Sequence, residues 1–276
     1  MGRVQQLEDL LENHPGIDVN WKDEQSWTAL HWASQNGHDR VVKVLLAQPA
    51  INVNVRNQYE STPVVFACGT TCISVIRMLL KDPRVDITLA DNCECTPLWF
   101  ASRYGYSEVV ECLMASGKDL GDLNKKGIWF SEQLSALDMA QREVRTDVVS
   151  LLERFIGNPA QTRHGLRMKL GVLDALAAEV FALAVFLCDD LVQLRPTLAS
   201  ATPIHDGPTR FFIIASTLPM ELQMILCHRV VGSGKQNILR KDSEAAFKAL
   251  AWILLRSPQN NSYSSLSLAT RLVSQQ

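Results

Sequence analysis

Pairs of adjacent aliphatic residues recur along the first half of the chain with helical spacing. Each group has apolar residues at i, i+1, i+4 and i+5, which places them on one face of a helix. The three groups are Val41, Val42, Leu45 and Leu46; Val75, Ile76, Leu79 and Leu80; and Val109, Val110, Leu113 and Met114. The pattern therefore predicts three amphipathic helices, each 34 residues after the last.

Two further motifs repeat at the same interval. One opens with Thr and ends with Ala, at Thr28–Ala33, Thr62–Ala67 and Thr96–Ala101. The other begins with Pro, at Pro15–Asn20, Pro49–Asn54 and Pro83–Thr88, and is followed in step by Asp23, Asn57 and Asp91. Because Thr caps free N–H groups and Pro at the next position costs no hydrogen bond, the first motif predicts a helix start. Each unit should contain a short helix, a second helix and an extended excursion closed by a turn.

These units resemble ankyrin repeats, whose consensus opens with Thr-Pro-Leu-His and spans about 33 residues. The resemblance covers residues 1–156: a half repeat at 1–20, full repeats at about 21–54, 55–88 and 89–122, and a divergent repeat at about 123–156. It implies an all-α ankyrin-repeat solenoid of helix–turn–helix units with short hairpin fingers, stacked because one repeat cannot bury its own apolar face. It also implies that His31 bridges backbone groups of neighbouring turns.

The fingers depart from the family pattern. Ser26, Glu60 and Glu94 stand where the family usually has Gly at the finger tip. The third and fourth opening motifs are 39 residues apart, so five extra residues fall within 117–133, close to the apolar triplet Ile128–Phe130. Of two interpretations of the triplet, an exposed binding hot spot or a seam against the C-terminal half, we favour the seam, because exposed apolar clusters are unfavourable without a partner.

The periodicity ends at Gly157–Pro159, and we predict a smaller α-helical C-terminal domain over 157–276. Its predicted elements are helices at Gly165–Asp190, Leu218–Val231 and Ser243–Leu255, the last capped by Ser243, a loop at Pro196–Pro208 and a short helix at Ser264–Val273. This half resembles the C-terminal regions that follow ankyrin arrays in fungal proteins of unknown role.

The segment Leu218–Ile225 resembles the opening of an F-box, a small helical module that docks a protein onto a ubiquitin ligase scaffold. The residues that carry this resemblance are Leu218, Pro219, Glu221, Leu222 and Ile225. Pro followed by Glu is also ordinary capping at a helix start, so a plain core helix is the other interpretation. The resemblance implies an alternative function, a substrate receptor or adaptor with ubiquitin ligase components as partners.

Composition narrows the classes of partner. The 276 residues are 47% hydrophobic and 20% charged, which is typical of a folded chain with a sizeable core. The net charge of −2 gives no general attraction for nucleic acid or an acidic membrane. Because the longest apolar run, Val180–Cys188, is too short to span a bilayer and no apolar leader follows Met1, we expect a cytoplasmic protein, with the nucleus as the alternative.

The candidate chemistry is sparse, and we predict no enzyme activity, no cofactor and no metal site. Residues 232–235 read Gly-Ser-Gly-Lys, but Arg229 replaces the first Gly of a phosphate loop and Gln236 its hydroxyl, so a helix-terminating turn is favoured. Cys68, Cys72, Cys93 and Cys95 could supply four zinc thiolates, yet they fall in different elements of neighbouring repeats.

Binding in such repeat proteins uses an extended concave surface made by the fingers and first helices. On the family pattern the outward positions are Glu24, Gln25, Trp27, Gln35, Asn36, Gln58, Tyr59, Ser61, Thr70, Asn92, Cys93, Cys95, Arg103 and Tyr104. Trp27, Tyr59, Arg103 and Tyr104 are the expected anchors, because aromatic and Arg side chains bury large areas at interfaces. Trp27 packing on the neighbouring finger, or Tyr104 covering the helix turn, is the structural alternative. We predict a non-enzymatic module that binds a protein ligand, whose identity the sequence leaves open.

Overall fold

The computed structural model describes residues 2–14, 16–188, 215, 218–233 and 235–256. The chain divides into two compact units, which we call the repeat unit, ending at Leu166, and the C-terminal unit, beginning at Arg167. Within the described part of the chain, no helix has the length and hydropathy that a membrane-spanning segment requires.

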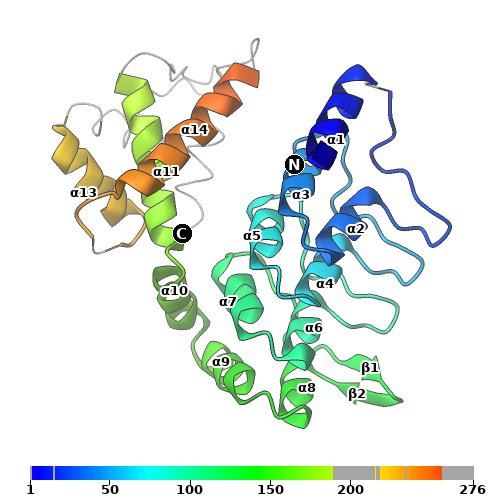
Figure 1. The fold of residues 1–276 in the computed structure, drawn as a ribbon. Coiled ribbons are helices and arrows are strands. Elements are labelled where there is room, and N and C mark those ends of the chain that lie inside the picture. The colour runs from blue at the N-terminus through cyan, green and yellow to red at the C-terminus, as the bar shows by residue number, and fades with distance from the viewer. Residues whose placement is uncertain (1, 15, 189–214, 216–217, 234, 257–276) are drawn as a thin grey trace, which may run out of the picture. The chain divides into compact units, whose positions relative to one another are not determined.

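The repeat unit is a stack of helix pairs (Figure 1). The first helices of the pairs are α2 (Ala29–Gln35), α4 (Pro63–Cys68), α6 (Pro97–Tyr104) and α8 (Ala136–Arg142). The second helices are α3 (Asp39–Leu46), α5 (Ile73–Lys81), α7 (Ser107–Ala115) and α9 (Thr146–Gly157). Helix α1 (Gly2–Asn13) packs on α3 in line with the second helices. The all-α solenoid expected from the resemblance is confirmed.

Local sequence sets where the first helices begin. Thr28, Thr62 and Thr96 are the N-cap residues of α2, α4 and α6, and Ser135 takes this place in α8. The Oγ1 of Thr96 accepts a hydrogen bond from the backbone N–H of Trp99 at 3.2 Å. The Oγ of Ser135 accepts in the same way from the N–H of Asp138 at 3.2 Å, so these two caps satisfy a donor that the helix leaves unpaired, whereas Thr62 makes no side-chain cap bond.

The core lies between the two layers of helices. The aliphatic pairs contribute to it from every full repeat: Val42, Val75, Ile76, Leu79, Val110 and Leu113 are fully buried. The small side chains of Ala33, Ala67 and Ala101 are also buried and allow the first helices to approach closely. The 34-residue repeat in the sequence therefore matches the repeat of buried positions from one helix pair to the next.

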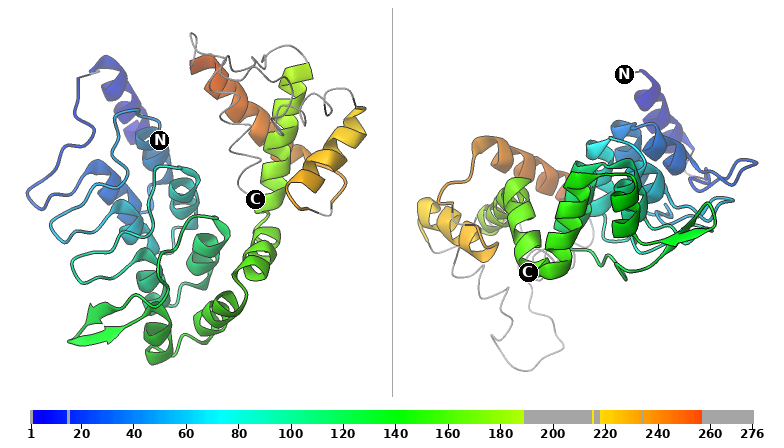
Figure 2. Two further views of the ribbon diagram at one scale, coloured as in Figure 1. Left: turned by 180° about the vertical axis from the view of Figure 1, so that it is seen from behind. Right: turned by 90° about the horizontal axis from the view of Figure 1, so that it is seen from below.

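Extended loops project from the helices to one side as fingers, and a two-stranded hairpin continues their series (Figures 1 and 2). Strands β1 (Gly127–Trp129) and β2 (Glu132–Leu134) pair antiparallel, with Gly127 opposite Leu134 and Trp129 opposite Glu132. The extra residues between the third and fourth opening motifs are therefore used to lengthen the last finger into a hairpin.

Helix α10 (Pro159–Lys169) begins within the repeat unit. The Nε of Arg163 donates to the carbonyl oxygen of Met114 at 3.1 Å, and its guanidinium carbon lies 5.5 Å from the centre of the Phe155 ring. These contacts extend the repeat unit through Leu166, whereas the boundary predicted from the sequence falls within α9.

The C-terminal unit packs α11 (Val172–Cys188) against α13 (Met220–Val230) and α14 (Arg240–Arg256). The prediction of one helix over 165–190 is wrong, because Gly171 adopts a φ of +67° and separates α10 from α11. The predicted cap at Ser243 is also wrong: α14 begins at Arg240, and the hydroxyl of Ser243 donates to the carbonyl oxygen of Arg240. The predicted loop at 196–208 and helix at 264–273 lie outside the described residues.

Candidate functional site

Each finger is closed by a side chain that accepts two backbone hydrogen bonds. The Oδ1 of Asp91 accepts from the N–H groups of Cys93 and Cys95, both at 2.9 Å. Asp23 and Asn57 make the same pair of bonds in the first two fingers. A side-chain acceptor at the start of a turn fixes the path of the next residues, so the three tips share one conformation.

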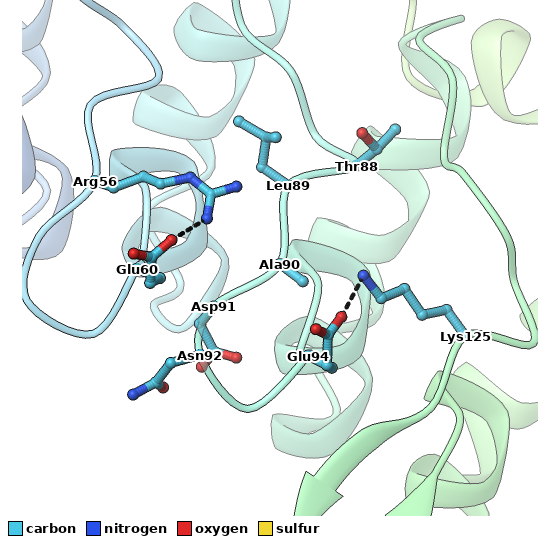
Figure 3. Close-up of a pocket in the computed structure, with 9 residues that line it drawn as sticks. All are labelled: Arg56, Glu60, Thr88, Leu89, Ala90, Asp91, Asn92, Glu94 and Lys125. Atoms are coloured by element: carbon cyan, nitrogen blue, oxygen red, sulfur yellow. Dashed lines mark hydrogen bonds and ion pairs between the residues drawn. The ribbon is translucent and has the colours of Figure 1, made fainter.

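The finger tips adopt left-handed backbone conformations at residues other than Gly. Ser26, Glu60 and Glu94 have φ values of +60°, +60° and +61°. These are the three positions where the family usually has Gly, which reaches this region without steric cost. The two glutamates use their side chains in ion pairs, Glu60 with Arg56 and Glu94 with Lys125 (Figure 3).

Backbone hydrogen bonds join each finger to the next. The N–H of Gln58 donates to the oxygen of Gln25 at 3.2 Å, and the N–H of Asn92 to the oxygen of Tyr59 at 3.0 Å. The N–H of Ile128, in β1, donates to the oxygen of Cys93 at 2.7 Å. The tips are therefore held side by side before any ligand binds, a link that the sequence analysis did not predict.

Most of the predicted site residues are accessible. Exposed among them are Glu24, Gln25, Gln35, Asn36, Gln58, Tyr59, Asn92, Cys93 and Tyr104, and Thr70 and Arg103 are half-buried. Three do not face outward as predicted: Trp27, Ser61 and Cys95 are exposed by only 7%, 5% and 2%. Each follows a left-handed tip, where the chain turns back toward the helices, so its side chain points into the repeat unit.

Trp27 shows this correction most clearly. Its ring lies 4.3 Å from Phe66 and 4.5 Å from Trp32, measured between ring centres. It therefore packs on its own first helix and on the next one, and not on the neighbouring finger as the alternative for this residue had it. Cys95 is buried against Gly127, and burial raises the pKa of its thiol to about 12.

An aromatic row on the first helices was not predicted from the sequence. Trp32, Phe66 and Phe100 occupy the fifth position of the three opening motifs; Trp32 is 45% exposed and the two Phe rings are half-buried. The Nε1 of Trp32 donates to the Oδ2 of Asp23 at 3.0 Å, which ties the ring to the finger. An aromatic residue repeated every 34 positions was the signal that could have found them.

The hairpin brings a second aromatic group to the same side. The Trp129 ring lies 6.0 Å from Trp99 and 4.7 Å from Phe130, and the guanidinium carbon of Arg103 lies 3.5 Å from its centre. Phe130 is 79% exposed. Ile128 and Trp129 contact the repeat unit itself, through the backbone of Cys93 and the rings of Trp99 and Phe130, and the seam against the C-terminal half stays a prediction.

We call the resulting surface the finger face. It consists of the accessible predicted residues of the fingers and first-helix ends together with the side chains of Trp32, Phe66, Phe100, Ile128, Trp129 and Phe130.

A polar pocket of about 310 Å³ opens between the second and third fingers and the segment that leads to the hairpin (Figure 3). Arg56 and Glu60 line one side, and Glu94 and Lys125 the other. The ammonium group of Lys125, 2.6 Å from Glu94, lowers the pKa of that carboxyl group. The pocket thus presents paired charges and backbone groups, which suit hydrogen bonding to a polar ligand.

His31 is a buried structural residue that bridges backbone groups of two repeats. Its side chain is fully buried; Nδ1 lies 3.1 Å from the N–H of Thr28 and Nε2 lies 3.1 Å from the oxygen of Ser61. A neutral ring with its proton on Nε2 satisfies both contacts, and burial lowers the pKa of the ring. In the third repeat the Nε1 of Trp99 makes the equivalent bridge, to the oxygen of Leu134 at 2.9 Å.

The four cysteines considered as zinc ligands differ in how far they are buried. Cys68 and Cys95 are buried, Cys72 is half-buried and Cys93 is exposed. Burial raises the pKa of the Cys68 thiol. Over the residues that the structure describes, no three His, Cys, Asp or Glu side chains form a group that could hold a metal ion.

The F-box-like segment forms the start of α13. Pro219 is its N-cap, Leu222 is 48% exposed, and the half-buried Leu218 accepts a hydrogen bond on its oxygen from the Nε2 of Gln223 at 2.8 Å. Glu221 is exposed, and Ile225 is half-buried.

The Gly-Ser-Gly-Lys segment ends α13 as predicted. Gly232 has a φ of +74°, and the N–H of Ser233 donates to the oxygen of His228 at 2.8 Å. Lys235 forms an ion pair with Asp174. The helix-terminating turn is confirmed.

Comparison with protein families places two matches on the repeat unit. A model of ankyrin repeats in three copies matches residues 2–91, and a model of a single ankyrin repeat matches residues 93–126. The matched segments contain the three fingers, helices α1 to α7 and the residues that lead to the hairpin.

Proposed function

The chain is an ankyrin-repeat protein, and we propose that it binds a protein ligand through its finger face. Ankyrin repeats serve in general as protein–protein interaction modules, which gives the class of partner. We choose the finger face as the binding surface because large aromatic side chains are exposed on it. Trp32 is 45%, Tyr59 51% and Phe130 79% exposed. Such side chains are the usual anchors of interfaces, because each buries a large area with few rotatable bonds.

The rigidity of the fingers supports the same proposal. The backbone bonds between Gln58 and Gln25 and between Asn92 and Tyr59 hold the tips in register. The capping carboxylate of Asp23 also holds the Trp32 ring. Because these groups are already ordered, binding a ligand costs less conformational entropy than it would on flexible loops.

A binding role rather than catalysis is supported by how the ionisable groups of the fingers are used. Asp23 and Asp91 accept backbone hydrogen bonds that shape the tips. Glu60 and Glu94 are in ion pairs with Arg56 and Lys125. These carboxylates have structural partners, which leaves the exposed aromatic and amide side chains to meet a ligand.

The proposal is tested by comparing the partners of three full-length chains, purified from the native cell and quantified by mass spectrometry. The chains are wild type, the double variant Tyr59→Ser with Phe130→Ser, and the control Ile156→Ser. Ile156 is 47% exposed on α9, in the layer of second helices, so it loses a similar side chain elsewhere. We expect at least one protein to be retained by wild type and control and lost by the double variant. Retention of every partner by the double variant contradicts the proposal.

A second candidate function is a ubiquitin ligase adaptor that docks through the start of α13. Met220 and Leu222 favour it, since both apolar side chains are exposed in the first turn, by 59% and 48%. The test is whether the full chain copurifies with ligase scaffold proteins and loses them on Met220→Ser with Leu222→Ser. Leu239→Ser, at a residue 51% exposed in the same unit, is the matched control. Absence of scaffold proteins from the wild-type sample rejects this candidate.

A further inference from the structure

Arg103 is held on the finger face by aromatic rings. It lies in the last turn of α6, with its guanidinium carbon 3.5 Å from the centre of the Trp129 ring and 5.0 Å from that of Tyr104. Tyr104 is itself stacked on Tyr106, with ring centres 5.6 Å apart. The side chain is therefore placed before a ligand arrives, by contacts from two different elements.

The backbone beneath this side chain is fixed as well. Gly105 ends α6 in the left-handed conformation, with a φ of +75°. The Nε of Arg145 donates to the oxygen of Arg103 at 3.3 Å. The position of the guanidinium group thus follows from both its side-chain and its main-chain contacts.

Among the residues that the structure describes, the charge of Arg103 has no carboxylate partner, unlike that of three other cations near this surface. Arg56, Lys125 and Arg142 are paired with Glu60, Glu94 and Glu132. In the described part of the chain, the polar side-chain contact of Arg103 is a bond from Nη1 to the hydroxyl oxygen of Tyr104 at 3.5 Å. Stacking engages the flat face of a guanidinium group, whereas its N–H donors lie in the plane, where a carboxylate binds with two parallel hydrogen bonds.

We propose that Arg103 is an anion subsite within the finger face that takes the carboxylate of an Asp or Glu side chain of the protein ligand. The exposed ring of Phe130, in contact with Trp129, takes an apolar side chain next to that acid. The ligand segment is therefore short, with one acidic residue beside an aromatic or aliphatic one. This inference rests on the proposed function and specifies the chemistry of the segment that the face accepts.

The overall charge of the repeats favours a single acid over a polyanion. Residues 1–155 carry 15 basic and 21 acidic side chains, a formal net charge of −6. A highly charged anion would meet this field over its whole length, whereas one carboxylate is stabilised locally by Arg103. At physiological salt, charges more than about 8 Å away are screened, so a single carboxylate at Arg103 is little affected by the distant acidic residues of the repeats.

The test uses a phage-displayed library of random peptides selected on the full chain. We expect the selected peptides to share an Asp or Glu next to an apolar residue. For a selected peptide, Arg103→Met should raise the dissociation constant at least about tenfold, the loss expected for a charge-assisted pair. Arg40→Met, which removes the same charge from an exposed residue of α3, should leave it unchanged.

A change in the peptide gives a readout that does not depend on how the variant folds. Replacing the acidic residue of the peptide by its amide should weaken binding to wild type as much as Arg103→Met does, and should add nothing further in that variant. Peptides without a shared acid, or an acid whose loss is additive with Arg103→Met, overturn the subsite. A phosphoserine in place of the acid that binds more than about tenfold tighter would assign the subsite to phosphate instead.

The two proposals fail in different ways. If selected peptides lose binding on Tyr59→Ser with Phe130→Ser but not on Arg103→Met, the finger face binds proteins and the anion subsite is wrong. If the selection yields no peptide that depends on Tyr59 or Phe130, the proposed function itself is contradicted, and the subsite with it.

Discussion

Replacing Ser26 by Gly should stabilise the repeat unit. Ser26 has a φ of +60°, in the region that costs a residue with a Cβ about 1–2 kcal/mol. Gly removes this cost but gives up about 0.5–1 kcal/mol of backbone entropy on folding. Because the described residues include no hydrogen bond to the Ser26 hydroxyl, little else is lost, and we expect a net gain of about 0.5–1 kcal/mol.

The same change at Glu60 should have a smaller effect, because it also removes the exposed ion pair with Arg56, which contributes about 0–1 kcal/mol. The assay is urea unfolding of the full chain, followed by tryptophan fluorescence. Trp252 is the one Trp beyond the repeat unit, so the signal reports mainly on the repeats.

Gln25→Gly is the matched control for this series. It lies one residue before Ser26 and does not have a positive φ, so it should lose about 0.5–1 kcal/mol. Unfolding of Ser26→Gly at no higher urea concentration than wild type, or equal stabilisation by Gln25→Gly, would show that the left-handed backbone at Ser26 is not strained.

Three further predictions test the geometry around the finger face. Gly37→Ala should destabilise the repeat unit by about 2 kcal/mol or more in the same urea assay. Gly37 has a φ of +69°, and an added Cβ would overlap the Sγ of Cys72. Unchanged stability would contradict this packing. His31 is buried and its pKa is lowered, so it must gain a proton on unfolding in acid. The stabilisation of the folded state by the neutral His31 ring is therefore present above the unfolded-state pKa of about 6.5, and it is lost as the pH falls below that value. His31→Gln should be less stable than wild type at pH 7.5, but it should lose less stability than wild type between pH 7.5 and 5.5. Iodoacetamide should label the exposed Cys93 in the native chain and spare Cys95, whose thiol is buried and has a pKa of about 12; peptide mass spectrometry that finds both equally labelled would refute the burial of Cys95.

The parts of the fold that could be predicted from the sequence are those that repeat. Thr28, Thr62 and Thr96 each stand at the N-cap of a first helix, and the aliphatic pairs recur in the same register, so periodicity located both layers of helices. The left-handed tips were located indirectly, as the positions where Gly was missing.

The parts that were missed depend on turn geometry and on long-range packing. Whether Trp27 faces inward is decided by the left-handed residue before it, which reverses the chain, and not by its place in the motif. The stacking of Arg103 on Trp129 joins a helix to a hairpin created by extra residues, and no sequence spacing encodes that contact. In the C-terminal unit, helical periodicity continued across Gly171 and concealed the break between α10 and α11.

Hydrogen–deuterium exchange of the full chain, with and without a copurified protein ligand, would locate the binding surface. We expect bound ligand to slow exchange in the fingers and first helices, at residues 24–36, 58–70 and 92–104, and in the hairpin at 127–134. The second helices α3, α5 and α7 should exchange at the same rate in both states. Protection confined to those second helices, or to the C-terminal unit, would contradict the assignment of the finger face as the binding surface.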